Sequence, residues 1–98
     1  MEFEWDEDKR RATIRKHGID FVDAVEIFDG PVLHLPARSD IELRRAVAGV
    51  LHGTIIAVIY TMRGDRIRII TARRARRYER EYFRAFHAGT DPADERRN

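Results

Sequence analysis

The order of apolar and polar residues along this chain predicts two helices near the start, strands in the middle and one helix at the end. Asp6 can cap a first helix that ends near His17, where Gly18 is a stop signal. Asp20 can cap a second helix, because apolar residues follow it at helical spacing: Phe21, Ala24, Val25 and Phe28. The first third of the chain is therefore expected to be mainly helical.

Several segments have the composition or alternation of β-strands. Residues 3–5 alternate between apolar and polar and predict a short first strand. Residues 55–61 are continuously apolar and rich in β-branched side chains, which indicates a central strand buried on both faces. Weaker strands are expected at residues 32–35 and 44–51.

A strand with one apolar and one basic face is expected after a hairpin turn at residues 63–65. Ile67 and Ile69 alternate with Arg66 and Arg68 over residues 66–71. The isoleucines should therefore face the core and the two arginines the opposite side of the sheet.

A final helix is expected over residues 74–88, with an apolar stripe of Ala75, Tyr78, Tyr82 and Phe86. The order of the elements predicts an α+β fold, an antiparallel sheet with the helices packed on one face. One domain should span residues 1–89, and residues 90–98 should form a polar, disordered tail.

Charge is distributed unevenly along the chain. Residues 1–30 contain nine acids and five bases, whereas residues 63–84 contain nine arginines and three acids. Arginine offers phosphate a planar pair of donors, which lysine does not. The basic segment therefore predicts a polyanionic ligand, although any single arginine could serve only as surface charge.

Several kinds of site and location are disfavoured by the residues present. The chain has no cysteine, and its four histidines, at positions 17, 34, 52 and 87, lack the spacing of metal ligands. There is no glycine-rich phosphate loop, and the only serine is not in a nucleophile motif. No apolar run is long enough to cross a membrane, and no signal peptide is recognisable. We expect a cytoplasmic protein without metal or cofactor.

The residue types present could support cleavage of RNA without a metal. That reaction needs a base, an acid and cations that stabilise a charged phosphorane. Arginines suit the last role, and His17 and Glu79 could carry protons. His17 could equally serve as a cap at the end of its helix, and Glu79 could equally pair with Arg76.

Three tyrosines could stack single-stranded bases: Tyr60, Tyr78 and Tyr82. Tyr78 and Tyr82 occupy stripe positions of the last helix, which favours a place in the core for both.

Two separated motifs resemble the BrnT toxins, over residues 2 to about 84. The first comprises Phe3-Glu4-Trp5-Asp6, Lys9, Arg15-Lys16-His17-Gly18-Ile19, Phe21, Ala24, Phe28 and Asp29. The second comprises Tyr60-Thr61, Arg63-Gly64-Asp65-Arg66-Ile67-Arg68-Ile69-Ile70, Thr71-Ala72-Arg73-Arg74-Ala75 and Glu79. Both motifs occur in the family's order, and Thr13 stands where the family usually has Asn.

The resemblance implies a RelE-like fold and a type II toxin, a metal-independent endoribonuclease that inhibits translation. It also implies neutralisation by a BrnA-like antitoxin of the ribbon-helix-helix type, through which alone operator DNA would be bound. Arg66, Arg68 and Arg73 would then hold phosphate, and Glu79 or His17 would move protons. Together with the basic last helix, the predicted site has catalytic residues His17, Arg66, Arg73 and Glu79, and RNA-binding residues Lys16, Arg63, Arg68, Arg77 and Arg80.

Two other functions need the same basic residues. The chain could be a non-catalytic module that binds RNA or the ribosome, or a co-repressor subunit that acts only with its antitoxin. Loss of cleavage with retained binding, on removal of a proton carrier, distinguishes the enzyme from the binding module.

Overall fold

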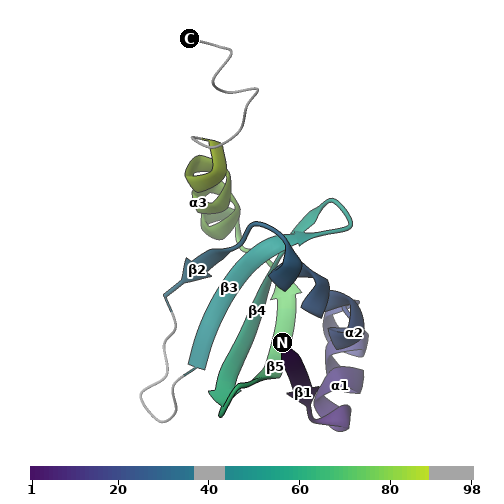
Figure 1. Cartoon of the computed structure of the whole chain (residues 1–98). Coiled ribbons are helices and arrows are strands. Elements are labelled where there is room, and N and C mark those ends of the chain that lie inside the picture. Colours follow the sequence, from purple (N-terminus) through teal and green to yellow (C-terminus); the bar gives the residue numbers. More distant parts are fainter. Residues whose placement is uncertain (37–43, 89–98) are drawn as a thin grey trace.

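The computed structural model describes residues 1–36 and 44–88 (Figure 1). Its elements, in chain order, are β1 (Glu2–Trp5), α1 (Glu7–His17), α2 (Phe21–Ala24), the 3₁₀ helix η1 (Val25–Asp29), β2 (Leu33–Leu35), β3 (Arg44–Leu51), β4 (Thr54–Arg63), β5 (Arg66–Arg74) and α3 (Arg77–Ala88). The predicted α+β class is confirmed, while the proposed tail at residues 90–98 lies outside the described residues. Within those described, no helix combines the length and the apolar content that a membrane span requires.

The first helix begins and ends where its capping residues predict. The Asp6 carboxylate accepts hydrogen bonds from the backbone N–H groups of Asp8, at 2.8 Å, and Lys9, at 3.2 Å. Gly18 ends the helix with a φ of 70°, a left-handed conformation that glycine adopts without steric cost. The second predicted helix starts at Phe21 behind Asp20, but it changes to a 3₁₀ helix from Val25.

The five strands form one sheet in the order β1-β5-β4-β3-β2. All neighbouring pairs are antiparallel except β1 with β5, which is parallel. The expected antiparallel sheet is therefore wrong at this edge. The first strand is far from β5 in sequence, so a long crossover joins them, as a parallel pair requires. The pairing places Glu2 opposite Arg66 and Glu4 opposite Arg68.

Strand β4 is buried on both sides, as its composition predicts. Ile56, Val58 and Tyr60 point to a side that packs against α2 and η1, and we call this side the N-terminal face. Ile55 and Ala57 point to the other side, which packs against Phe83 of α3 and which we call the C-terminal face. The expectation that all helices share one face is therefore wrong. A strand that is apolar on both sides needs cover on both, and Figure 1 shows α3 apart from α1 and α2.

The apolar stripe predicted for the last helix is also displaced. Glu79 and Phe83 are buried, whereas Tyr78, Tyr82 and Phe86 are each more than half exposed. The helix begins at Arg77 rather than Arg74 because β5 continues to Arg74. Its rotation is set by Glu79, a charged side chain that periodicity alone would assign to solvent.

Gly49 of β3 provides a test of the packing on the N-terminal face. A Cβ atom there would lie 2.7 Å from Cβ of Ile27, and neither atom can move without its backbone. We expect Gly49→Ala to lower the free energy of unfolding by about 1–3 kcal/mol in urea titrations. Gly30→Ala is the control, because its Cβ would meet nothing closer than 4.0 Å. Equal losses in the two variants would show that this contact does not limit the packing.

Candidate functional site

Helix α3 covers only part of the C-terminal face and leaves a basic area next to it. Residues paired directly across neighbouring strands point to the same side of a sheet. The pairs Thr61 with Arg68, Arg63 with Arg66, and Arg44 with Thr61 thus share one side. Predicted residues Arg63, Arg66 and Arg68 are therefore brought together on this open area.

A β-bulge adds Arg73 to the same side. Tyr60 pairs with Ile69 and Ile59 with Thr71, so Ile70 is an extra residue in β5. Regular alternation would place Arg73 on the side of Ile69; after the bulge it pairs with Ala57 of the C-terminal face. We call Arg66, Arg68 and Arg73 the arginine row. The bulge places Arg73 on the same side of β5 as Arg66 and Arg68.

Two glutamates of β1 compensate part of this charge. Arg66 Nε lies 3.0 Å from a carboxylate oxygen of Glu2, and Arg68 Nη1 lies 2.7 Å from one of Glu4. Arg63 is 3.8 Å from the same Glu4 oxygen. The Arg66–Glu2 pair is exposed, and such pairs contribute roughly 0–1 kcal/mol, so a phosphate group of a bound chain can replace this carboxylate at little cost. The Arg68–Glu4 pair is part-buried and is held more tightly.

Arg73 is held by a much stronger contact. Its two terminal nitrogens donate to the two carboxylate oxygens of Glu79, at 2.7 and 3.1 Å. The backbone N–H of Arg76 donates to the same carboxylate at 2.8 Å, which caps the start of α3. The Glu79 side chain is only 4% exposed, against 21% for Arg73. One buried carboxylate therefore fixes both an arginine of the row and the end of a helix.

The pKa of Glu79 shows how these effects balance. Burial alone would raise it, but the hydrogen bonds from Arg73 and from the Arg76 backbone, together with the charge of Arg73, lower it below its ordinary value. The carboxylate is thus ionised at neutral pH and engaged by three donors. The pairing of Glu79 with Arg76 that the sequence suggested is present, but the donor is the backbone N–H of Arg76 and not its guanidinium group. This geometry favours positioning of Arg73 over proton transfer.

Lys16 and His17 lie at the edge of the arginine row. They line a small groove together with Lys9, Ala12, Thr13, Ile70 and Thr71. Thr71 lies three residues after Arg68 and two before Arg73, which corresponds to about 10 and 7 Å along a strand. The structure therefore brings a histidine, half-buried at the end of α1, against the stretch of β5 between Arg68 and Arg73.

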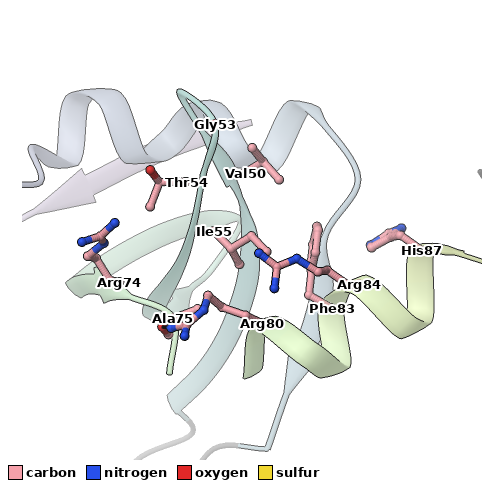
Figure 2. A pocket seen from close by; sticks show the side chains of 10 residues that line it. All are labelled: Val50, Gly53, Thr54, Ile55, Arg74, Ala75, Arg80, Phe83, Arg84 and His87. Atoms are coloured by element: carbon pink, nitrogen blue, oxygen red, sulfur yellow. Dashed lines mark hydrogen bonds between the residues drawn. The ribbon is translucent and has the colours of Figure 1, made fainter. Parts of the chain in front are cut away.

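The remaining predicted residues do not join this row. Arg77 is exposed and pairs with Glu81 on the surface of α3. Arg80 lies on another flank of the helix, in a groove shown in Figure 2, where it donates to the Ala75 carbonyl at 2.6 Å. Arg74 and Arg84 also line that groove; they belong to the basic segment of the sequence but were not among the predicted site residues. The spacing of Arg80 and Arg84, one helical turn apart, was the available signal.

The tyrosines differ from their expected roles as well. Tyr60 is buried on the N-terminal face against Phe28 and is not accessible to a base. Tyr78 is 61% exposed. The pKa of Arg73 is raised mainly by its hydrogen bonds to Glu79 and to a smaller extent by the nearby Tyr78. An accessible aromatic ring thus lies in the first turn of α3, next to Glu79 in sequence.

The donor set differs from that of a metal centre. In the part of the chain that the structure describes, no three His, Cys, Asp or Glu side chains gather where they could hold an ion. What the site offers is guanidinium groups on a sheet, an imidazole at their edge and an exposed phenol ring. Such groups bind phosphates and can stabilise charge that develops on them.

Comparisons with known proteins agree with this chemistry. A family model described as "Ribonuclease toxin, BrnT, of type II toxin-antitoxin system" matches residues 5–79. The crystal structure of the Brucella abortus ribonuclease toxin BrnT is similar to this chain, with 36% sequence identity and a TM-score of 0.65. The match covers 79% of this chain and 99% of that one. No curated protein sequence matches this chain.

Glu79→Gln tests the buried ion pair. We expect it to reduce the free energy of unfolding by about 1–3 kcal/mol at pH 7, because Arg73 loses its charged partner. Since the pKa of Glu79 is lowered in the folded state, the stabilisation is present above the ordinary pKa and is lost as pH falls through the folded one. The difference between parent and variant in urea titrations should therefore shrink at acidic pH.

Glu81→Gln is the matched control, on the same helix but in an exposed pair with Arg77. We expect it to change stability by less than about 0.5 kcal/mol. A pH-independent difference for Glu79→Gln would contradict the assigned ionisation.

Proposed function

Because this chain belongs to the BrnT family of ribonuclease toxins of type II toxin–antitoxin systems, we propose that it cleaves RNA without a metal ion and thereby inhibits translation. The observation that carries the proposal is the arginine row, aligned by the bulge and flanked by His17. Three guanidinium groups on one side of β5 suit a ligand that carries several phosphates.

The arginines bind the substrate and stabilise its reacting phosphate. Arg66 and Arg68 exchange their glutamate partners for phosphate oxygens, which form charge-assisted hydrogen bonds of the same kind. Arg73 keeps its pair with Glu79 and is held in one orientation before RNA arrives. Donors fixed in advance need no reorganisation when charge develops in the transition state. This term can replace the charge that a metal ion supplies in other nucleases.

Cleavage begins when the 2′ oxygen attacks the neighbouring phosphorus and loses its proton to a base. The bond from phosphorus to the 5′ oxygen then breaks, and an acid protonates the leaving oxygen, so that the products are a 2′,3′-cyclic phosphate and a 5′ hydroxyl. We assign His17 to one of these proton transfers because it is accessible at the edge of the row. Glu79, buried and engaged by three donors, acts through Arg73 as a positioning residue.

The antitoxin partner implied by the family is proposed to be BrnA-like and of the ribbon-helix-helix type. It would act in the cytoplasm, inhibit by covering the arginine row, and provide the only contact with operator DNA. The second helical segment and its cap, residues 20–29, contain four acids, which disfavours direct docking of this segment on DNA phosphates.

A non-catalytic module that binds RNA or the ribosome is the second candidate. It is favoured by one observation, that the Glu79 carboxylate is already saturated by Arg73 and Arg76. A binding module needs the arginines but no proton carrier. Replacement of His17 therefore distinguishes it from an enzyme.

Cleavage of total RNA by the purified chain in EDTA tests the proposal. We expect cleavage by the parent, a loss of roughly a hundredfold or more in His17→Gln, and a similar loss in Arg66→Gln. Arg15→Gln, an exposed change on the same helix as His17, should cleave like the parent.

Binding of an uncleavable 2′-O-methyl RNA should be retained by His17→Gln and weakened in Arg66→Gln. Binding without cleavage by the parent, on free RNA and on translating ribosomes alike, would establish the non-catalytic module instead. Cleavage by His17→Gln at the parental rate would remove His17 from the mechanism.

Expression in growing bacteria tests translation inhibition and neutralisation. We expect incorporation of labelled amino acids to fall soon after induction, and to recover when the adjacent antitoxin is expressed together with the chain. His17→Gln should leave incorporation unchanged while still binding the antitoxin. A parent that leaves amino-acid incorporation intact would show that RNA of the translation apparatus is not its target.

A further inference from the structure

A second basic groove lies on the flank of α3 that faces the β3–β4 hairpin (Figure 2). It is an open groove of about 820 Å³. Val50, Ile55 and Phe83 line its apolar part, and three arginines line it as well: Arg74 from the end of β5, and Arg80 and Arg84 from α3. No residue of the predicted site except Arg80 belongs to it.

The charge of this groove is less compensated than that of the arginine row. Arg66, Arg68 and Arg73 each have a carboxylate within 3.0 Å. None of the described residues that line the groove is an acid, and the one side-chain hydrogen bond that Arg80 makes there goes to a backbone carbonyl. Three cations in a concave surface raise the local concentration of anions. The groove therefore selects an anionic ligand.

The Arg73–Glu79 pair separates the groove from the arginine row. Arg74 follows Arg73 directly and Arg80 follows Glu79, and neighbouring residues point to different sides of their strand or helix, so the two basic sites are close in sequence but distinct. Arg80 and Arg84 are one helical turn apart, with Cβ atoms separated by about 5–6 Å. That separation is comparable with the distance between successive phosphates of a single strand.

We propose that this groove is a second subsite for RNA, which binds backbone phosphates away from the bond that is cut. The inference rests on the proposed function, because it takes the same substrate and extends its contact beyond the arginine row. Arg80 and Arg84 hold successive phosphates, and Arg74 adds a third positive charge to the lining of the groove. Long RNA is thereby favoured over short fragments, without selection of sequence.

Fluorescence anisotropy with two uncleavable 2′-O-methyl probes tests this subsite in the full-length chain. One probe has three nucleotides and is too short to contact both sites at once; the other has twelve. For Arg80→Gln/Arg84→Gln we expect roughly tenfold weaker binding of the long probe and a clearly smaller loss for the short one, which can still bind the arginine row. The slope of log affinity against log salt should fall by about 1.4 for the long probe, since each single-strand phosphate contributes about 0.7.

Arg11→Gln/Arg15→Gln is the matched control, two exposed arginines with the same spacing on α1. It should bind both probes like the parent. Arg74→Gln/Arg84→Gln is a second variant that keeps the hydrogen bond from Arg80 to Ala75, and it should show the same selective loss.

Equal binding of the long probe by parent and groove variants would overturn the subsite, as would equal weakening of both probes. A variant that binds RNA normally but no longer binds the antitoxin would assign the groove to an acidic protein segment instead. Because neither probe can be cleaved, these outcomes are independent of whether the chain is a nuclease.

Discussion

Strand β4 is apolar on both sides, and the rest of the molecule is arranged to cover it. The N-terminal helices bury one side, where Ile56 and Val58 lie. On the other side only the half that holds Ile55 and Ala57 needs burial, so one short helix is enough. The remaining half of that face continues into Thr61 and Arg63, which tolerate water. The open basic area is thus the part of the sheet that the core does not require.

The bulge at Ile70 and the carboxylate of Glu79 connect this area to the core. The bulge turns Arg73 from the side of the N-terminal helices to the C-terminal face, beside the start of α3. There Glu79 meets it, and the same carboxylate caps α3. A charged residue is thereby buried with all its partners supplied by the chain, which is the condition under which burial of a charge is tolerated. Stability of the helix and orientation of the arginine depend on one contact.

Much of the fold followed from local signals, whereas long-range pairing did not. The caps at Asp6 and Gly18, and the alternation of Ile67 and Ile69 with arginines, act within a few residues and were confirmed. The parallel pairing of β1 with β5, and the packing of α3 on the face opposite to the other helices, depend on contacts between distant segments. The periodicity of apolar residues carries no information about such contacts. The bulge was missed because one inserted residue leaves no pattern. The arginines were foreseen as a set, but their division between a row on β5 and a groove beside α3 depends on the bulge and on how the helix packs on the sheet.

Glu2 and Glu4 of β1 act as anionic partners that belong to the same chain as the arginine row. They are tethered within hydrogen-bond distance of Arg66 and Arg68, so their effective concentration there is high. A single small anion, such as inorganic phosphate or a mononucleotide, replaces only one contact and competes poorly with a tethered carboxylate. A polymer replaces several of these contacts at once, but it loses the translational and rotational entropy of only one molecule. The protein can therefore stay unoccupied among abundant cellular metabolites and still respond to long nucleic acid chains.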